Sequence, residues 1–340
     1  MSQVFSGLEA LVVLVVLASC GVSCPTSCDC PSISEAVCYS NPAPGRLPSG
    51  LPTGITSLVL GHANLSYLAN DTMSAVRTLQ RLELRDVRLK WVQAGAFHAL
   101  ASLQTLGLQD NFLDYLEPNM FLDNPRLWFL DLSGNDLHVA NNSVFLISLS
   151  LRELNASRCR LDYLPDQAFQ GLLELRVLHL EGNYLHFLHM RMLSPLLQLT
   201  HIYLQDNRIN SLRNTPAASP APLLSHMDLS GNLLTTVNTD AVGVAGALRQ
   251  LLMLRNPLVC DCRLAPARSW LEARGIEAPG HCAAPLHLVG VDWRGVHEPA
   301  CSTGALTPGH SRPPAALASA EQGLAQSAAV LACFSVLLLV

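Results

Sequence analysis

One spacing repeats through the middle of this chain. The stretch Leu127–Val144 contains the pattern L-x-x-L-x-L-x-x-N-x-L with every position filled. Copies open 24 residues apart, with one spacing of 25, at Ile55, Leu79, Leu103, Leu127, Leu151, Leu175, Leu199, Leu224 and Leu248. A fixed period of this length indicates an array in which each unit buries its apolar face only against its neighbours. We therefore expect one elongated domain rather than two globular ones.

Each copy predicts a short strand. The apolar residues at positions 1, 4 and 6 point inward, and the residues between them point outward onto a shared sheet. Position 9 turns the chain, and an Asn there can bond the backbone of neighbouring turns. It is occupied by Asn111, Asn135, Asn183, Asn207, Asn232 and Asn256, and elsewhere by Ala63, Val87 and Cys159. The pattern is that of a leucine-rich repeat, which predicts an α/β solenoid, a horseshoe with a parallel β-sheet on its concave side. Cys159 is then expected to be a buried, unreactive thiol.

Eight of the eleven cysteines form two clusters of four, one on each side of the repeats. They are Cys24, Cys28, Cys30 and Cys38, and Cys260, Cys262, Cys282 and Cys301. Two even clusters predict two disulfide-stapled caps and an oxidising compartment. Zinc is disfavoured because structural zinc sites usually leave at least two residues between paired cysteines, and both clusters contain Cys-x-Cys. Spacing alone leaves three connectivities open in each cluster.

The segments C-P-T-S-C-D-C and N-P-L-V-C-D-C resemble the flanking caps of extracellular leucine-rich repeat proteins such as Slit, the Nogo receptor, chondroadherin and the variable lymphocyte receptors. The resemblance covers the chain from Cys24 to Cys301. It implies the pairs Cys24–Cys30, Cys28–Cys38, Cys260–Cys282 and Cys262–Cys301. It also implies an N-terminal cap over residues 24–54, eight repeats over 55–247 and a C-terminal cap over 248–301.

The N-terminal end of the chain is apolar. Residues 1–23 read as a secretory signal peptide, because the aliphatic run Leu11–Leu17 is too short to span a bilayer. Cleavage after Ser23 or after Cys20 would each leave small residues at the site. A lipidated Cys20 is an alternative, which the absence of basic residues before the run disfavours.

The C-terminal end is apolar as well. Residues 302–327 are rich in Pro, Ala, Ser and Gly and are interpreted as a stalk. Residues 328–340 form an apolar tail with no basic residue after it, which is typical of a GPI-anchor signal. Ala318 or Ser319 is the expected attachment residue. A short transmembrane span and a secreted product are the alternatives, so the expected location is the extracellular side of the plasma membrane, through a lipid anchor or a short span.

The function suggested by these features is recognition. None of the common hydrolase, metalloprotease or phosphate-binding motifs occurs, so we expect no enzyme, no cofactor and no metal site. No basic run accompanied by aromatic residues indicates nucleic acid. The sequence favours a cell-surface adhesion molecule or receptor that binds an extracellular protein on its concave face. A soluble matrix protein, or a co-receptor ectodomain on a short membrane span, is the alternative.

Candidate ligand-binding residues occupy outward strand positions, because the inward positions are committed to packing. They are Phe129, Asp131, His179, His201 and Tyr203, with His226 in the same row of histidines. A polar, weakly aromatic surface without a ligand, a metal site and a pH-sensitive contact remain alternative interpretations of the histidines.

Four sequons predict glycosylation, at Asn64, Asn70, Asn141 and Asn155. Asn155 differs from the others because it falls on the concave sheet, where a glycan would obstruct a central ligand. If Asn155 carries a glycan, we expect binding by the C-terminal half or by an edge.

Overall fold

The computed structural model describes residues 24–39, 46–141, 143–214, 221–243 and 245–296. The chain divides into two compact units, residues 1–302 and 303–340, and every described residue belongs to the first. The expected signal peptide, stalk, apolar tail and attachment residues Ala318 and Ser319 lie outside the described residues, as do Cys301 and most of the Pro-rich stretch 213–222. Among the described residues, no helix has the length and apolar character needed to cross a bilayer.

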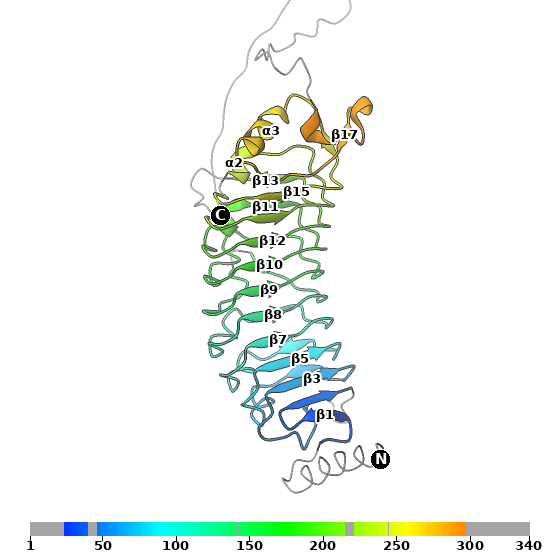
Figure 1. The fold of residues 1–340 in the computed structure, drawn as a ribbon. Coiled ribbons are helices and arrows are strands. Elements are labelled where there is room, and N and C mark those ends of the chain that lie inside the picture. The colour runs from blue at the N-terminus through cyan, green and yellow to red at the C-terminus, as the bar shows by residue number, and fades with distance from the viewer. Residues whose placement is uncertain (1–23, 40–45, 142, 215–220, 244, 297–340) are drawn as a thin grey trace, which may run out of the picture. The chain divides into compact units, whose positions relative to one another are not determined.

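One sheet of eleven strands organises this unit (Figure 1). Its strands, in spatial order, are β1 Cys28–Ser32, β2 Glu35–Cys38, β3 Ser57–Gly61, β5 Arg81–Arg85, β7 Thr105–Gly107, β8 Phe129–Asp131, β9 Glu153–Asn155, β10 Val177–His179, β12 His201–Tyr203, β14 His226–Asp228 and β15 Gln250–Leu252. From β2 onward neighbouring strands are parallel, and from β3 onward equivalent repeat positions pair, for example His179 with Tyr203. The predicted parallel-strand solenoid is therefore correct.

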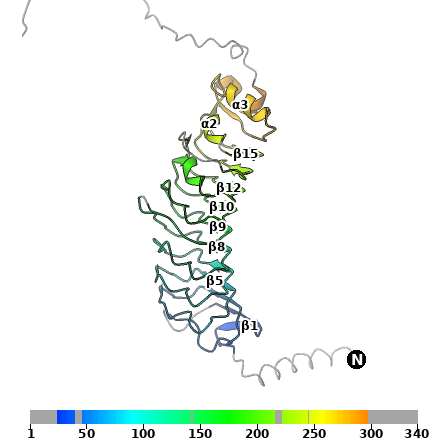
Figure 2. The same cartoon turned by 90° about the vertical axis from the view of Figure 1, so that its left-hand side faces the viewer.

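The opposite side of the stack consists mostly of turns, as the side view shows (Figure 2). Its regular elements are short: β4 Tyr67–Leu68, β6 Trp91–Val92, β11 Phe187–His189, β13 Ser211–Arg213, the 3-10 helix η1 Met190–Leu193 and α2 Thr239–Val242. The strands β4 and β6 form one two-stranded parallel sheet, and β11 and β13 form another. The sequence analysis did not predict these small sheets, because two or three residues carry no periodic signal.

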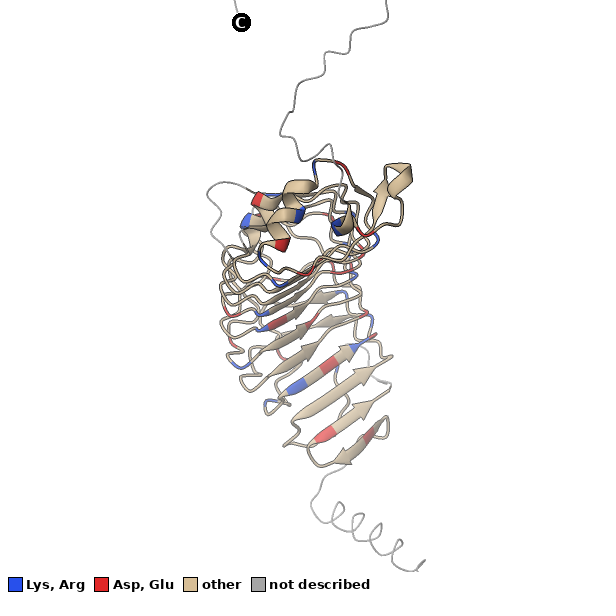
Figure 3. Ribbon diagram, turned by 45° about the horizontal axis from the view of Figure 1, so that its top comes forward, with Lys and Arg blue, Asp and Glu red and all other residues tan. Residues whose placement is uncertain are grey.

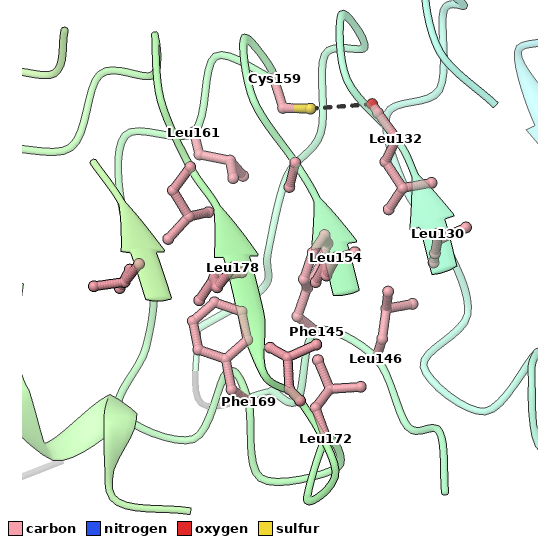
Figure 4. Packing of buried hydrophobic residues seen from close by; sticks show 14 of the residues in the cluster. Leu130, Leu132, Phe145, Leu146, Leu154, Cys159, Leu161, Phe169, Leu172 and Leu178 are labelled. Atoms are coloured by element: carbon pink, nitrogen blue, oxygen red, sulfur yellow. Dashed lines mark hydrogen bonds between the residues drawn. The ribbon is translucent and has the colours of Figure 1, made fainter. Parts of the chain in front are cut away.

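The core lies between the main sheet and the convex turns (Figure 4). Inward leucines such as Leu130, Leu154 and Leu178 are fully buried. On the convex side, Phe97 and Phe121 stack with ring centroids 5.7 Å apart. Each turn thus completes its core only against the next turn, which explains why the apolar residues recur with the repeat period.

The buried Asn residues at position 9 link the turns through four or five backbone groups each, and Asn183 bonds four. Its Oδ1 accepts hydrogen bonds from the amides of Cys159 (2.9 Å) and Leu161 (3.1 Å). Its Nδ2 donates to the carbonyls of Ala156 (2.9 Å) and Leu180 (2.8 Å). An Asn side chain has one acceptor oxygen and one donor nitrogen, so it can satisfy both kinds of buried backbone group at once.

Two of the three turns without this Asn use the backbone instead. The carbonyl of Val87 accepts from the amide of Leu65 at 2.8 Å, and the carbonyl of Cys159 accepts from Leu137 at 3.1 Å. In both turns the following residue is left-handed, with φ +59° at Arg88 and +57° at Arg160. In both turns, therefore, the main-chain carbonyl at position 9 accepts the hydrogen bond that an Asn Oδ1 accepts in other turns, and the residue after it is left-handed. The predicted burial of Cys159 is confirmed, and its Sγ lies 3.2 Å from the carbonyl oxygen of Leu132.

The main sheet ends in a disulfide-bonded hairpin on one side, and on the other side its last strand is covered by the chain that follows. At the N-terminus the hairpin β1–β2 pairs with β3, and disulfides join Cys24 to Cys30 and Cys28 to Cys38. At the other edge the carbonyl of Glu277 accepts from the amide of Leu251 at 2.8 Å. Covering an edge in this way prevents its unpaired backbone groups from recruiting other chains.

The C-terminal cap contains β16 Leu258–Val259, the helix α3 Ala265–Glu272, β17 Cys282–Ala284 and the short helices η2 Leu286–Leu288 and η3 Trp293–Gly295. A disulfide joins Cys260 to Cys282. Cys262 is also disulfide-bonded, and its expected partner Cys301 lies outside the described residues. The Trp293 indole is buried and donates to the carbonyl of Ala278 at 2.9 Å, which fixes the end of the cap.

Candidate recognition surface

The outward side of the main sheet is the surface on which the sequence placed its candidate residues. We call the outward side chains from Ser57 in β3 to Leu252 in β15 the concave face. In most of these strands, buried side chains alternate with half-buried ones, as in β8, where Leu130 is buried between two half-buried residues. This alternation places positions 3 and 5 of every turn on the concave face.

Four rings meet on this face, and we call His179, His201, Tyr203 and His226 the ring cluster. His179 and Tyr203 pair across β10 and β12, with centroids 4.7 Å apart and planes 14° apart. His201 and His226 pair across β12 and β14, with centroids 4.2 Å apart and planes 11° apart. The 24- and 25-residue spacings therefore bring together residues that the sequence could only place on the same side.

His179 lies between two carboxylates. Its Nδ1 is 3.3 Å from Glu181 Oε1 and its Nε2 is 3.6 Å from Glu153 Oε1. Burial lowers the pKa of His179, but the hydrogen bond and charge of Glu181, followed by those of Glu153, outweigh burial and leave the pKa raised. Charge on His179 is thus favoured by the folded state.

His201 and His226 have a different environment. The Nδ1 of His201 is 2.8 Å from Thr200 Oγ1, and the Nδ1 of His226 is 2.7 Å from Ser225 Oγ. Burial, and then the neighbouring His226, lower the pKa of His201. The neutral form of His201 is therefore favoured in the folded protein, in contrast to His179.

The candidate Phe129 lies two turns away from the ring cluster, in β8. It is half-buried and packs at a tilt against Trp128, with centroids 5.9 Å apart, while Trp128 itself is exposed. The Asp131 side chain stabilises the turn after β8, because its Oδ1 accepts a hydrogen bond from the amide of Ser133 at 2.9 Å. The structure does not bring Phe129 and Asp131 together with the ring cluster.

The sequon Asn155 sits in the middle of the concave face, paired with Asp131 on one side and His179 on the other. Its Oδ1 accepts from the amide of Ser157 at 3.0 Å and from the Ser157 hydroxyl at 2.7 Å. The three other sequon residues, Asn64, Asn70 and Asn141, are exposed. Glycosylation of all four stays a prediction.

Glu181 and Gln205 are surface residues that the sequence analysis missed. They occupy position 7 of their turns, the next outward position after His179 and Tyr203. The Oε2 of Glu181 and the Oε1 of Gln205 are shielded from solvent and have no hydrogen-bond partner. Extending the period-2 alternation by one step would have found them.

Metal-binding and thiol chemistry gain no support within the described part of the chain. There, no three His, Cys, Asp or Glu side chains lie close enough to hold a metal ion. Cys159 is the buried free thiol of this part, and burial raises its pKa to about 12. A thiol with so high a pKa is protonated at physiological pH and is a poor nucleophile.

The leucine rich repeat family model matches residues 77–137 and 150–209. Over 78 residues the chain is 41% identical to the platelet glycoprotein Ib beta chain of Mus musculus and 38% identical to that of Homo sapiens. The match covers 22% of this chain and 37% of each relative, so the chain spans little more than a third of their length.

Two solved structures share the fold. The crystal structure of human 5T4 (Wnt-activated inhibitory factor 1, trophoblast glycoprotein) is 24% identical, with a TM-score of 0.58, and the match covers 82% of this chain and 97% of that one. A chain of the octameric complex of Latrophilin 3, Unc5D and FLRT2 is 23% identical, with a TM-score of 0.53 and coverages of 81% and 98%. The repeat spacing, the parallel sheet and the family-model matches agree: the described part of the chain has the leucine-rich repeat fold, with disulfide bonds on both sides of the repeats.

Proposed function

We propose that this chain is a recognition protein on the extracellular surface of cells, which binds a protein ligand with the C-terminal half of its concave face. The ring cluster is the observation that carries this proposal. Aromatic and imidazole rings on a stiff sheet present contact area at a small cost in conformational entropy, and such groups are typical anchors of protein interfaces. The cap disulfides support an oxidising, extracellular location.

A membrane anchor completes the proposal. The apolar tail 328–340 and the small residues around Ala318 and Ser319 support attachment through a GPI lipid. Treating cells that express the full chain with a phospholipase C specific for phosphatidylinositol should release it into the medium. Retention on the treated cells would point to a membrane span, and accumulation in the medium of untreated cells would point to a secreted matrix protein.

A binding screen tests recognition itself. The full chain displayed on cells would be probed with a library of extracellular proteins, and each ligand retested on Tyr203→Ala and His179→Ala variants. Because a central interface ring typically contributes about 2 kcal/mol, we expect Tyr203→Ala to weaken binding about thirtyfold. Tyr67→Ala is the matched control, since Tyr67 is an exposed tyrosine in β4, outside the main sheet. A ligand lost with Tyr67→Ala and kept with Tyr203→Ala would contradict the proposal.

A further inference from the structure

The C-terminal half of the concave face carries acidic groups that no Lys or Arg balances. In the four turns that contain β9, β10, β12 and β14, no Lys or Arg occupies outward position 3, 5 or 7. The carboxylates of Glu153, Glu181 and Asp228 do. Within the described residues, the ion-pair contacts of Glu153 and Glu181 are with His179, and Asp228 Oδ1 accepts from the amide of Ser230 at 2.9 Å.

The N-terminal half is balanced by comparison. Strand β5 alternates basic and acidic residues, as its blue, red and blue segments show (Figure 3). There Arg81 pairs with Glu83, and Arg85 pairs with Asp110 at 3.2 Å. The two halves of one sheet therefore differ in charge. At the outward positions, two Arg balance two carboxylates in the first half, whereas no Lys or Arg balances the three carboxylates of the second half.

The hydrogen bonds of Thr200 and Ser225 determine the tautomers of His201 and His226. The Thr200 hydroxyl donates to the carbonyl of Arg176 at 3.0 Å, and the Ser225 hydroxyl donates to the carbonyl of Thr200 at 3.1 Å. A hydroxyl has one proton, so a hydroxyl that donates to the carbonyl accepts from the imidazole beside it. In the other tautomer each hydroxyl would donate to Nδ1 and lose its hydrogen bond to the carbonyl. We therefore assign the proton of each imidazole to Nδ1, which leaves the lone pair of Nε2 available as an acceptor.

The two available lone pairs do not suit a shared metal ion. Because the ring planes are only 11° apart, the lone pairs run side by side rather than converging on one point. A metal ion binds imidazole in the plane of the ring, at about 2.0–2.1 Å from the nitrogen. Two separate N–H donors fit this pair better, because each can approach one ring in its own plane.

Glu181 and Gln205 add acceptors beside the rings. An oxygen shielded from water without a hydrogen bond costs about 1–3 kcal/mol. The Glu181 side chain retains 28% of its exposure, so a small rotation can bring the carboxylate to an incoming donor. A ligand that supplies the donor would recover the lost hydrogen bond.

We propose that this half of the concave face receives a basic segment of a protein ligand, whose Lys or Arg side chains donate to His201, His226, Glu181 and Asp228. This inference rests on the proposed function and specifies the chemistry of the partner. Arg and Lys fit the site because they carry several donors and no acceptor.

Acid should release such a segment, because protonation converts each Nε2 from an acceptor into a donor. The neighbours of the His201–His226 pair contain no group that would reverse this effect. Val177 faces His201 from β10, and Gln250 faces His226 from β15. Asp228 is two residues along β14 from His226, and Tyr203 is two residues along β12 from His201.

The test uses the purified full chain and two labelled probe peptides of about twelve residues, one alternating Arg and Gly and the other alternating Glu and Gly, read by fluorescence anisotropy at physiological ionic strength. We expect the Arg peptide to bind and the Glu peptide to fail. The double variant Glu181→Gln and Asp228→Asn should weaken binding of the Arg peptide at least about tenfold, because charge-assisted hydrogen bonds are lost. Glu83→Gln is the matched control, since Glu83 is already paired with Arg81.

A second double variant, His201→Phe and His226→Phe, keeps two stacked rings and removes their acceptors. Wild type should lose the Arg peptide between about pH 7.4 and pH 5.5, and this variant should bind it weakly at both. Nitrogen NMR of the two imidazoles should show the Nδ1-protonated tautomer. The inference is overturned if the Glu peptide binds equally well, if Glu181→Gln with Asp228→Asn has no effect, or if the opposite tautomer is found. A protein ligand that needs Tyr203 but tolerates Glu181→Gln with Asp228→Asn would refute this inference alone, whereas one indifferent to Tyr203→Ala would refute the proposed function.

Discussion

Replacing Asn183 by Val should destabilise the protein by about 4 kcal/mol. The substitution removes four buried hydrogen bonds, two from Oδ1 and two from Nδ2, each worth about 1 kcal/mol. Val fills a similar volume, so the loss measures the hydrogen bonds rather than a cavity. Urea unfolding followed by circular dichroism gives the free energy, and hydrogen exchange at the Cys159 and Leu161 amides locates the damage.

The chain supplies its own compensating substitution. Two of the turns without Asn contain Val87-Arg88 and Cys159-Arg160, with the Arg in the left-handed region. Transplanting the second pair as Asn183→Cys with Tyr184→Arg should therefore restore one amide–carbonyl bond and one weak thiol bond. We expect the double variant to recover about 2 kcal/mol relative to Asn183→Val.

Two results would refute this reasoning. A loss below about 1 kcal/mol for Asn183→Val would mean that water or backbone shifts satisfy the exposed groups without the side chain. A double variant no more stable than Asn183→Cys alone would mean that a left-handed residue at position 184 does not help the carbonyl of residue 183 to accept the new hydrogen bond. Protection of the Leu161 amide in the double variant would show the replacement directly, because Leu137 is the equivalent donor in the native turn.

Three further predictions concern single positions. Gly231→Ala should lower the free energy of unfolding, measured by thermal unfolding, by about 1–2 kcal/mol, because Gly231 has φ +68° and a Cβ there would meet the Asp206–Arg255 ion pair. Gly246→Ala is the control and should be nearly neutral, because the space around Gly246 is open. The raised pKa of His179 contributes stability that is fully present below its ordinary value of 6.5 and is lost as the pH rises through the folded value, so the free energy of unfolding should fall over that window in wild type and not in His179→Gln. Cys159 should resist alkylation at about pH 8 in the folded protein and react only after denaturation, as mass spectrometry would show.

The outcome at position 9 shows how far sequence reasoning reaches. The repeat pattern predicted that an Asn there would bond neighbouring turns, and the ladder follows, because the donors and acceptors of one amide are fixed by its chemistry. The pattern did not predict what replaces Asn at Val87 and Cys159. That answer lies in the backbone angle of the next residue, and an Arg in the left-handed region carries no sequence signal of its own.

On the concave face, too, the sequence predicted the side of the sheet on which residues lie but not the contacts between them. Spacing alone put His179, His201 and Tyr203 on one side of the sheet, and it separated them from the inward leucines. It did not show that Glu181 and Glu153 flank His179, because such contacts depend on side-chain direction. It also missed the exposed Tyr67 and Trp91, which pair in the small sheet β4–β6 on another side of the turns.

The sequence by itself determined the solenoid, its parallel sheet and the inward residues, because the period of the apolar pattern must match the period of the turns. The resemblance of the cysteine segments supplied the pairing of Cys24 with Cys30, which spacing had left open. Only the tertiary structure decided which outward side chains meet, which hydroxyl lies beside each of the paired imidazoles and which carboxylates lie against His179. Those properties arise between strands that are 24 or 25 residues apart, and the stacking of the turns is what brings them within a hydrogen bond of one another.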